Sequence, residues 1–185
     1  MYKQAADFIS KVEGFNEFAV WDQNAWRLGH GSDTITFSNG TFRKVVQGDR
    51  TTKENAAKDL KRRIPEFEKK VIDYIGKYGV TPDQWKKLPD PAKVGLLSFA
   101  YNYGNIVKNA VREAIKTGDV DLIANAVLTS TINDKIGTNV YNGLRKRRQK
   151  EADLIRSQKR KTPKILKAAL PIVAIVAAYY LIQEL

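Results

Sequence analysis

The chain has 185 residues, of which 43% are hydrophobic, with 32 Lys and Arg against 20 Asp and Glu. This length and composition exclude wholesale disorder and two large domains, and they suit one domain with an appendage. Because the chain has no Cys and a single His, it has no disulfide, no thiolate zinc site, no cysteine nucleophile and no multi-histidine metal site. We therefore expect neither a cofactor nor a metal ion.

The basic excess is concentrated near the carboxyl end. Residues 1–142 contain 21 basic and 17 acidic side chains, whereas residues 143–167 contain 11 basic and 2 acidic ones. This stretch stands directly before an apolar tail, so the two are best interpreted together. The charge predicts a polyanionic partner, with anionic lipid or a cell-wall polymer favoured over a specific nucleic acid.

The first 50 residues change from a helical pattern to a strand pattern. Apolar residues at helical spacing predict an amphipathic helix that ends near Glu13 and Gly14. Residues 16–48 are rich in Phe, Trp, Thr, Val and Gly, and an Asn-Gly pair lies within 38–41. We expect a small antiparallel sheet here, in which Thr34 to Phe37 pairs with Thr41 to Val46.

The pattern is helical again after residue 51. The expected helices are a long charged one after TTKE that Pro65 kinks or divides, a short one at 81–85, an apolar core helix at 90–103, two more near 106–117 and 119–128, and a basic one from 139 to about 159. The sequence thus predicts an α+β fold that is mostly α-helical, with a strand region at about 16–48 and a helical lobe at 51–160.

The segment 161–185 contains 16 consecutive uncharged residues, from Ala168 to Gln183. Lys164 and Lys167 precede this run, and Tyr179 lies near its end, as is typical of a segment anchored at a membrane interface. We expect a transmembrane anchor or a membrane-active helix that binds anionic lipid, although the run is a little shorter than the roughly 20 residues of a full span. A buried terminal helix is the alternative, because short apolar runs are also common in protein cores.

Two carboxylates are the candidate catalytic groups. Glu13 stands at the end of the first helix, and Asp22 follows nine residues later in an aromatic, Gly-rich region. Glycoside hydrolysis needs one protonated carboxyl to protonate the leaving oxygen and one ionised carboxylate to direct water or stabilise positive charge on the sugar. The spacing alone is weak evidence, since most such pairs of acids are solvated.

The residues around this pair strengthen the case, because three ordered blocks resemble the phage-type lysozymes of glycoside hydrolase family 24. The blocks are VEGF at 12–15 with WD at 21–22 and RLGHG at 27–31, AKVGLLSFAYNYGN at 92–105, and NGLRKRRQKEADLI at 142–155. The resemblance spans the expected globular part, residues 1–160, and stops before the tail. It implies a lysozyme-like catalytic domain.

The resemblance also implies roles for individual residues. Glu13 becomes the general acid and Asp22 the carboxylate that positions water, as in an inverting muramidase, with Asp22 as a covalent nucleophile in a retaining reaction as the alternative. The family has a Thr as its third functional residue, but here Arg27 stands at that position. Thr34 or Ser32 is the alternative source of a hydroxyl, with Ser32 also a candidate for binding substrate.

Further candidate residues lie in the second and third blocks. The resemblance implies that Arg147 pairs with Glu13, and that Tyr101 and Asn102 contact N-acetyl groups or sugar hydroxyls. A solvated helix face is the alternative for Arg147, and core packing is the alternative for Tyr101. Trp21 and Trp26 flank Asp22 and either stack on sugars or pack into the core.

The expected function is a peptidoglycan hydrolase that cleaves between N-acetylmuramic acid and N-acetylglucosamine during phage-induced lysis or virion penetration. We expect a monomer associated with the virion membrane or the host inner membrane and acting on the bacterial cell wall. Two alternatives remain open. One is a lytic transglycosylase, and the other is a non-catalytic lysozyme-like virion protein that binds membrane or nucleic acid.

Overall fold

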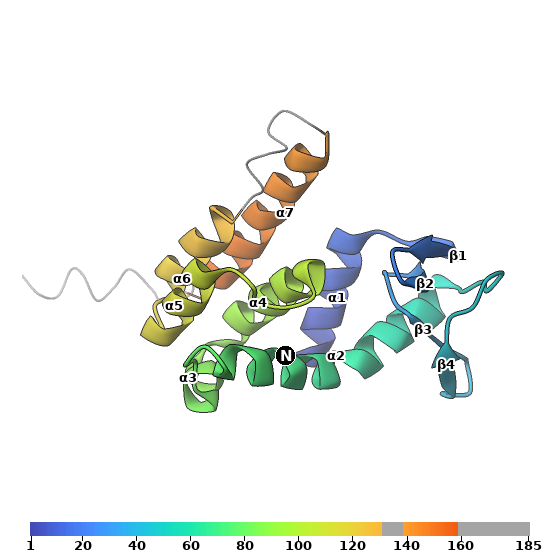
Figure 1. Cartoon of the computed structure of the whole chain (residues 1–185), viewed down its shortest axis with the longest axis horizontal. Helices are drawn as coiled ribbons and strands as arrows, with labels where there is room; N and C mark the ends of the chain where they lie inside the picture. Colours follow the sequence, from blue (N-terminus) through green and yellow to red (C-terminus); the bar gives the residue numbers. More distant parts are fainter. Residues whose placement is uncertain (131–138, 159–185) are drawn as a thin grey trace, which may run out of the picture.

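Seven α-helices and four short β-strands make up the part of the chain that the computed structural model describes, residues 1–130 and 139–158 (Figure 1). The elements are α1 Tyr2–Glu13, β1 Asn16–Asp22, β2 Ala25–Gly29, β3 Thr34–Thr36, β4 Phe42–Lys44, α2 Lys53–Gly76, α3 Pro82–Lys87, α4 Asp90–Tyr103, α5 Asn109–Thr117, α6 Val120–Leu128 and α7 Asn139–Arg156. Figure 1 shows the strands at one end of the molecule and α3, α5, α6 and α7 at the other, with α2 running between the two ends.

Helix α1 forms as expected and delivers Glu13 at its last position. Ala5, Ala6 and Ile9 are buried on one face, which packs toward α2 and α4. The helix stops at Gly14, whose φ of 76° favours glycine. The predicted boundary near Glu13 and Gly14 is therefore confirmed.

The strand region forms two separate two-stranded antiparallel sheets, β1 with β2 and β3 with β4, so the expectation of a single sheet is wrong. The predicted pairing of the second hairpin is confirmed, since Thr34 lies opposite Lys44 and Thr36 opposite Phe42. Each strand is short, and among the described residues the small core beneath them consists of the buried Leu28, Ile35 and Val45. This small core is too limited to bind many strands into one sheet.

Helix α2 is continuous through Pro65, so this proline does not divide it. The Thr52 hydroxyl accepts a hydrogen bond from the Asn55 backbone N–H and caps the first turn. Leu60, Ile64 and other apolar side chains at helical spacing are buried along one face. The helix thereby connects the strands to the helical lobe.

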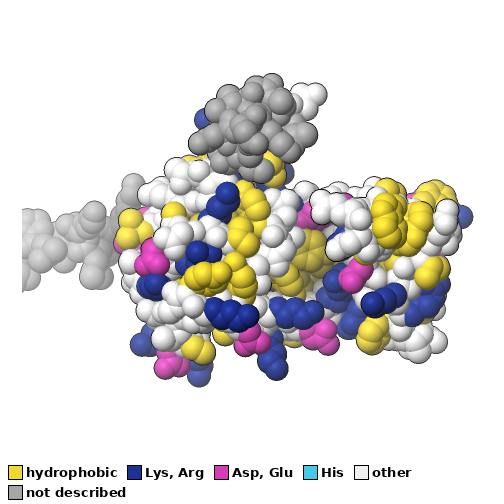
Figure 2. Space-filling view, in the orientation of Figure 1, with side chains coloured by type: hydrophobic (Ala, Val, Ile, Leu, Met, Phe, Trp, Pro, Cys, Tyr) yellow, Lys and Arg dark blue, Asp and Glu magenta, His cyan; other side chains and the backbone are white. Residues whose placement is uncertain are grey.

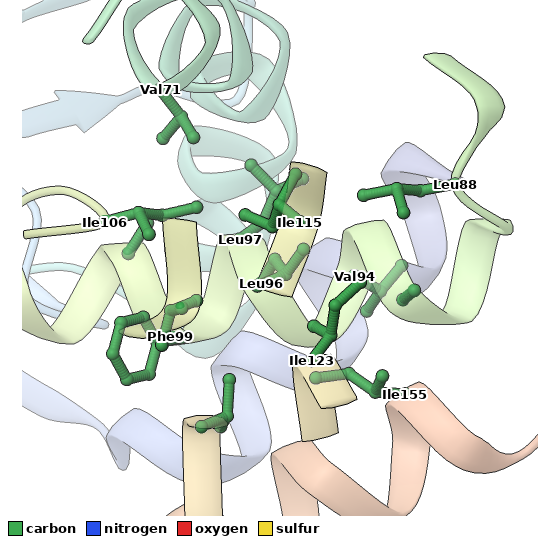
Figure 3. Close-up of a cluster of buried hydrophobic side chains, with 14 of the residues drawn as sticks. Val71, Leu88, Val94, Leu96, Leu97, Phe99, Ile106, Ile115, Ile123 and Ile155 are labelled. Atoms are coloured by element: carbon green, nitrogen blue, oxygen red, sulfur yellow. The ribbon is translucent and has the colours of Figure 1, made fainter. Parts of the chain in front are cut away.

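Helix α4 is the central core helix, as predicted. Every residue from Val94 to Ala100 is buried, and Figure 3 shows Val94, Leu96, Leu97 and Phe99 surrounded by side chains from α2, α5, α6 and α7. Gly95 allows close packing against α7, because a Cβ there would lie 2.6 Å from Ile155 Cγ1. The position of α7, and of the side chains it bears, is thus set by contact with α4.

The remaining helices agree with the expected ones apart from their ends. The helix expected near 106–117 begins at Asn109, and the basic helix expected to reach about 159 ends at Arg156. In the ranges 1–130 and 139–158, every helix is too short or too polar to cross a bilayer. The apolar segment 161–185, expected to be a membrane anchor, lies outside the described residues and stays a prediction.

Candidate active site

Glu13 forms an ion pair with Arg147. The carboxyl leaves the end of α1, and its Oε1 lies 2.6 Å from Nη2 of Arg147 on α7. Both side chains are largely removed from water, with exposed fractions of 19% for Glu13 and 9% for Arg147. The structure thus brings together two residues that are 134 positions apart in the chain, at a partly buried site where charges interact strongly.

Two further contacts fix the Arg147 guanidinium. Its Nε donates to Oε1 of Glu151 at 3.0 Å, and its Nη2 also donates to the Ser98 carbonyl at 2.9 Å. Burial alone would lower the pKa of Arg147, but the contacts with Glu13 and Glu151 outweigh it and raise this pKa. The Arg147 guanidinium beside Glu13 therefore stays positively charged, and these contacts hold it in place.

A second buried arginine extends this cluster. Arg148 and Glu151 are both fully buried, and Arg148 Nη1 donates to Glu151 Oε2. Arg148 Nη2 donates to Oδ1 of Asn102, and its guanidinium carbon lies 4.6 Å from the ring centre of Phe99. Desolvation lowers the pKa of Arg148 from its ordinary value, although Glu151 counteracts this. The basic run at 145–150 is therefore not a uniformly solvated face, because its two central arginines point inward.

Asp22, the second predicted carboxylate, lies at the end of β1 and is more exposed. Its Oδ2 is 2.9 Å from Nε of Arg27 on β2, and the side chains are 55% and 34% exposed, respectively. Arg27, which the sequence resemblance aligns with the third position, is thus the ion-pair partner of Asp22. A second contact from Arg27 Nη1 to the Gly31 carbonyl is long, at 3.4 Å.

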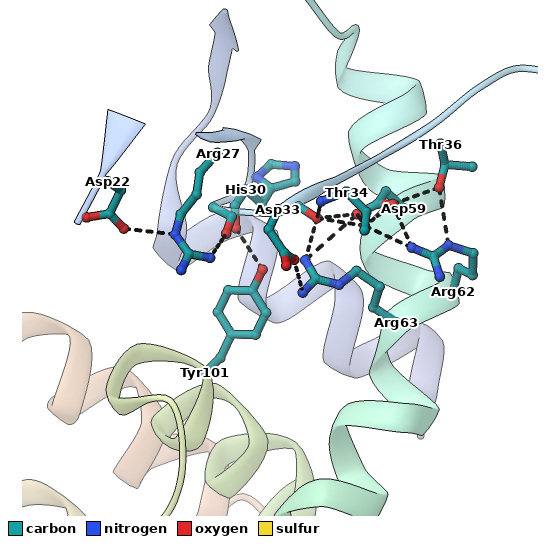
Figure 4. A network of polar contacts seen from close by, with 12 residues as sticks. Asp22, Arg27, His30, Asp33, Thr34, Thr36, Asp59, Arg62, Arg63 and Tyr101 are labelled. Carbon is teal, nitrogen blue, oxygen red and sulfur yellow. Dashed lines mark hydrogen bonds and ion pairs between the residues drawn. The ribbon is translucent and has the colours of Figure 1, made fainter. Parts of the chain in front are cut away.

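The segment around His30 connects the surroundings of the two carboxylates. His30 Nδ1 donates to the carbonyl of Gly14, the residue after Glu13, while Arg27 contacts the next residue along, Gly31. Tyr101, from the end of α4, donates its hydroxyl to the His30 carbonyl at 3.0 Å (Figure 4). Burial raises the pKa of Tyr101 to about 12, so this phenol remains a neutral donor. The segment is held against both α1 and α4.

Ser32 and Thr34 face Asp59 of α2. Ser32 Oγ donates to Asp59 Oδ2 at 2.5 Å and Thr34 Oγ1 donates to Asp59 Oδ1 at 2.9 Å, while Thr36 Oγ1 adds a third bond at 2.7 Å (Figure 4). Arg62 donates to the same carboxylate at 3.0 Å. The hydroxyls expected near Asp22 or the substrate therefore bind a buried carboxylate that anchors β3 to α2.

This network determines the ionisation of Asp59. Burial would raise its pKa, but the hydrogen bonds from Ser32, Thr36, Arg62 and Thr34 outweigh burial, so the pKa of Asp59 is lowered. Sequence reasoning missed Asp59. Its position between Ala56 and Leu60, on the apolar face of an amphipathic helix, was the available signal.

The two tryptophans beside Asp22 contact each other at the end of the β1–β2 hairpin. Trp21 and Trp26 form an edge-to-face pair with ring centres 5.5 Å apart. Trp21 is more than half exposed, as are Phe18 and Val20 on the same strand. Figure 2 shows hydrophobic side chains gathered on the surface at this end of the molecule. Trp26 instead packs against the small core of Leu28, Ile35 and Val45.

With this geometry established, comparison with known proteins identifies the family. The sequence model of the phage lysozyme family matches residues 10–151, which is most of the chain and includes both carboxylates, Arg27 and Arg147. The chain belongs to the phage lysozyme family. No curated protein sequence matches it.

Solved structures of two proteins resemble this phage lysozyme family member in fold. The active form of the P1 phage endolysin Lyz is 19% identical with a TM-score of 0.59, covering 86% of this chain and 87% of that one. The muramidase domain of SpmX from Asticaccaulis excentricus is 22% identical with a TM-score of 0.58, covering 86% of this chain and 95% of that one. Both likenesses confirm a lysozyme-like fold.

Two residues that contact Arg147 had no role in the sequence analysis. Ser98 and Glu151 contact Arg147 directly, and Glu151 joins it to Arg148. Glu151 lies four residues after Arg147 and three after Arg148, the spacings at which helical side chains meet. That spacing could have indicated from the sequence that Glu151 contacts both arginines. Its burial was not predictable, because it depends on how α7 packs on α4.

Proposed function

We propose that the protein is a peptidoglycan hydrolase, and specifically a muramidase that cleaves between N-acetylmuramic acid and N-acetylglucosamine. The observation that supports this most directly is the ion pair of Glu13 with the buried Arg147, within a phage lysozyme domain. A carboxyl held at a helix end, beside a fixed cation and out of bulk water, suits controlled proton transfer.

In this mechanism the two carboxylates have different tasks. Glu13, when protonated, gives its proton to the oxygen of the leaving sugar. Asp22, ionised and half exposed, directs a water molecule to the anomeric carbon and stabilises the positive charge that develops on the sugar ring. The bond to the leaving oxygen breaks as the bond to water forms, and the attacking water gives its proton to Asp22, with inversion at the anomeric carbon as the proposed outcome.

A lytic transglycosylase is the second candidate, and the arrangement around Asp22 favours it. The Ser32 and Thr34 hydroxyls bind Asp59, and Arg27 is the partner of Asp22. A site in which a cation replaces a water-binding hydroxyl suits attack by the sugar's own 6-hydroxyl group, which leaves an anhydro end instead of a reducing end. The products therefore discriminate the two reactions.

The test is to incubate the full-length protein with purified peptidoglycan and identify the new glycan ends by mass spectrometry. Reducing-end N-acetylmuramic acid supports the muramidase, and anhydro-muramic acid supports the transglycosylase. Reducing-end N-acetylglucosamine contradicts the proposed bond. If several wall types release nothing, the catalytic proposal fails and the non-catalytic binding protein becomes the better account.

We infer from the sequence of residues 161–185 that this segment brings the hydrolase to a membrane. Its apolar run follows a basic stretch, a combination that favours anionic lipid surfaces. Flotation with vesicles of phosphatidylglycerol and phosphatidylcholine tests it. We expect the full chain to float with these vesicles. A variant with Val173→Asp and Ile175→Asp should remain in the bottom fraction, without vesicles. Equal flotation of both proteins would contradict this assignment.

A further inference from the structure

Glu13 and three side chains of α7 form a largely buried charged cluster beside α4. Its members are Glu13, Arg147, Glu151 and Arg148, connected in that order by ion pairs. Glu151 is central, because it receives hydrogen bonds from both arginines and a further one from Ser98 Oγ at 2.7 Å. Both carboxylate oxygens of Glu151 therefore accept hydrogen bonds from other side chains of the protein.

The charges in this cluster depend on whether Glu13 holds a proton. With Glu13 ionised, two arginines face two carboxylates and the cluster is neutral. With Glu13 protonated, as a general acid must be, two positive charges face Glu151 alone. Without Glu151 the protonated state would leave two buried arginines with no counter-charge, which is costly at low dielectric.

Groups on the other elements around Glu13 do not replace this counter-charge. Tyr101 of α4 is a neutral phenol that donates to the His30 carbonyl, and His30 donates to the Gly14 carbonyl. The charge of Asp22 is already matched by Arg27, at 2.9 Å. Near the Tyr101 phenol, Arg63 is paired with Asp33 at 2.7 Å. Among the described residues, Glu151 is therefore the carboxylate that acts on Glu13 through Arg147.

We propose that Glu151 is a positioning residue for the reaction, which holds the Arg147 guanidinium against Glu13 and supplies the buried negative charge that lets Glu13 keep the proton it donates. This inference rests on the proposed function and extends it to a residue that contacts neither substrate nor Glu13. The hydrogen bond from Arg147 Nε to Glu151 fixes the guanidinium plane and leaves Nη2 directed at Glu13.

The test uses two substitutions that change the charge of the cluster in opposite directions. Glu151→Gln removes a negative charge, so Glu13 should lose its proton more readily, and the alkaline limb of the pH–activity profile should move to lower pH by roughly one unit. Arg148→Gln removes a positive charge and should move the same limb to higher pH. The double variant restores the charge balance and should return the limb toward that of the parent protein. Glu151→Asp, which keeps the charge, should preserve most of kcat.

Glu68→Gln is the matched control. Glu68 is also a buried carboxylate, and it accepts hydrogen bonds from Tyr2 Oη at 2.9 Å and from Trp85 Nε1 at 2.8 Å. Tyr2 begins α1 and Glu13 ends it, so Glu68 contacts the opposite end of this helix, about 16 Å along its axis from Glu13. This variant should lose stability without moving the pH profile.

A measurement that does not depend on peptidoglycan hydrolysis tests this inference independently of the proposed function. The Glu13 carboxyl carbon, labelled with 13C and assigned by its loss in Glu13→Gln, is titrated by NMR in each variant. Opposite displacements of its midpoint in Glu151→Gln and Arg148→Gln support the inference even if the protein releases nothing from peptidoglycan. Unchanged midpoints in both variants overturn it, whether or not the parent protein is an active hydrolase.

Discussion

Arg27 Nε lies 2.9 Å from Asp22 Oδ2, across the two strands of the first hairpin. In the strand register Arg27 is opposite Val20 and Asp22 is opposite Ala25, so the ion pair runs diagonally over the hairpin. The sequence resemblance assigns this position to a Thr in the family. A hydroxyl able to bind water is therefore replaced by a cation that binds the carboxylate itself.

We expect Arg27→Ala to lower kcat/KM by roughly 10- to 100-fold, because Asp22 then loses the group that orients it. Stability should change by only about 0.2–1 kcal/mol, since the pair is partly exposed. Peptidoglycan turnover and thermal unfolding, measured on the same preparation, separate the two effects. Undiminished turnover would show that Asp22 needs no orientation by Arg27.

Arg27→Lys is the informative companion variant. It keeps the positive charge but lacks the planar, multi-donor geometry of the guanidinium. If charge alone matters, its turnover should match that of the parent protein. If orientation matters, as we expect, its turnover should fall between those of the parent and Arg27→Ala.

Asp59 should make the fold sensitive to acid. Because hydrogen bonds from Ser32, Thr36, Arg62 and Thr34 outweigh burial, the folded-state pKa of Asp59 is below its ordinary value of 3.8. The ionised carboxyl therefore stabilises the fold above about pH 3.8, and this contribution disappears as the pH falls through the folded-state pKa.

Asp59→Asn tests this dependence. The substitution should lower the free energy of unfolding at pH 7 by about 2–3 kcal/mol, because charge-assisted hydrogen bonds are lost. Urea unfolding at several pH values should show the difference between the two proteins shrinking below about pH 3.8. A constant difference across this range would mean that the charge of Asp59 is unimportant.

Gly95→Ala should disturb the contact between α4 and α7. The added Cβ would lie 2.6 Å from Ile155 Cγ1 and 3.0 Å from the Glu151 carbonyl oxygen, so α7 must shift. We expect a loss of about 1–3 kcal/mol in the free energy of unfolding, together with reduced activity, because Arg147 moves with α7.

Gly143→Ala, which lies on α7 itself, is the control for this substitution. A Cβ at Gly143 meets no atom within 4 Å, and alanine is the better helix former. Chemical unfolding should show that this variant is more stable by about 0.5–1 kcal/mol. Equal effects of the two substitutions would contradict the close packing at Gly95.

Much of the helical framework could be predicted because it follows from local patterns. The boundary of α1 at Gly14 and the apolar run of α4 each reflect nearby residues, through a positive φ and through continuous burial. The pairing of Thr34 with Lys44 likewise follows from an Asn-Gly turn between alternating residues.

The rest depends on contacts between distant segments, which a periodicity does not encode. The burial of Arg148 requires α7 to pack on α4, and the hydroxyls of Ser32 and Thr34 turn to Asp59 only because β3 lies on α2. Two separate hairpins formed instead of one sheet for a related reason, since the small core of Leu28, Ile35 and Val45 offers little apolar area.

The most direct test of the central claim is the initial rate at which new glycan ends appear when peptidoglycan is treated with the parent protein, Glu13→Gln and Glu66→Gln. Glu66 is exposed on α2 and serves as the matched control. If Glu13 is the general acid, Glu13→Gln should reduce the rate by roughly 10²- to 10⁴-fold while Glu66→Gln leaves it unchanged. A Glu13→Gln protein that is folded and as active as the parent would contradict the account.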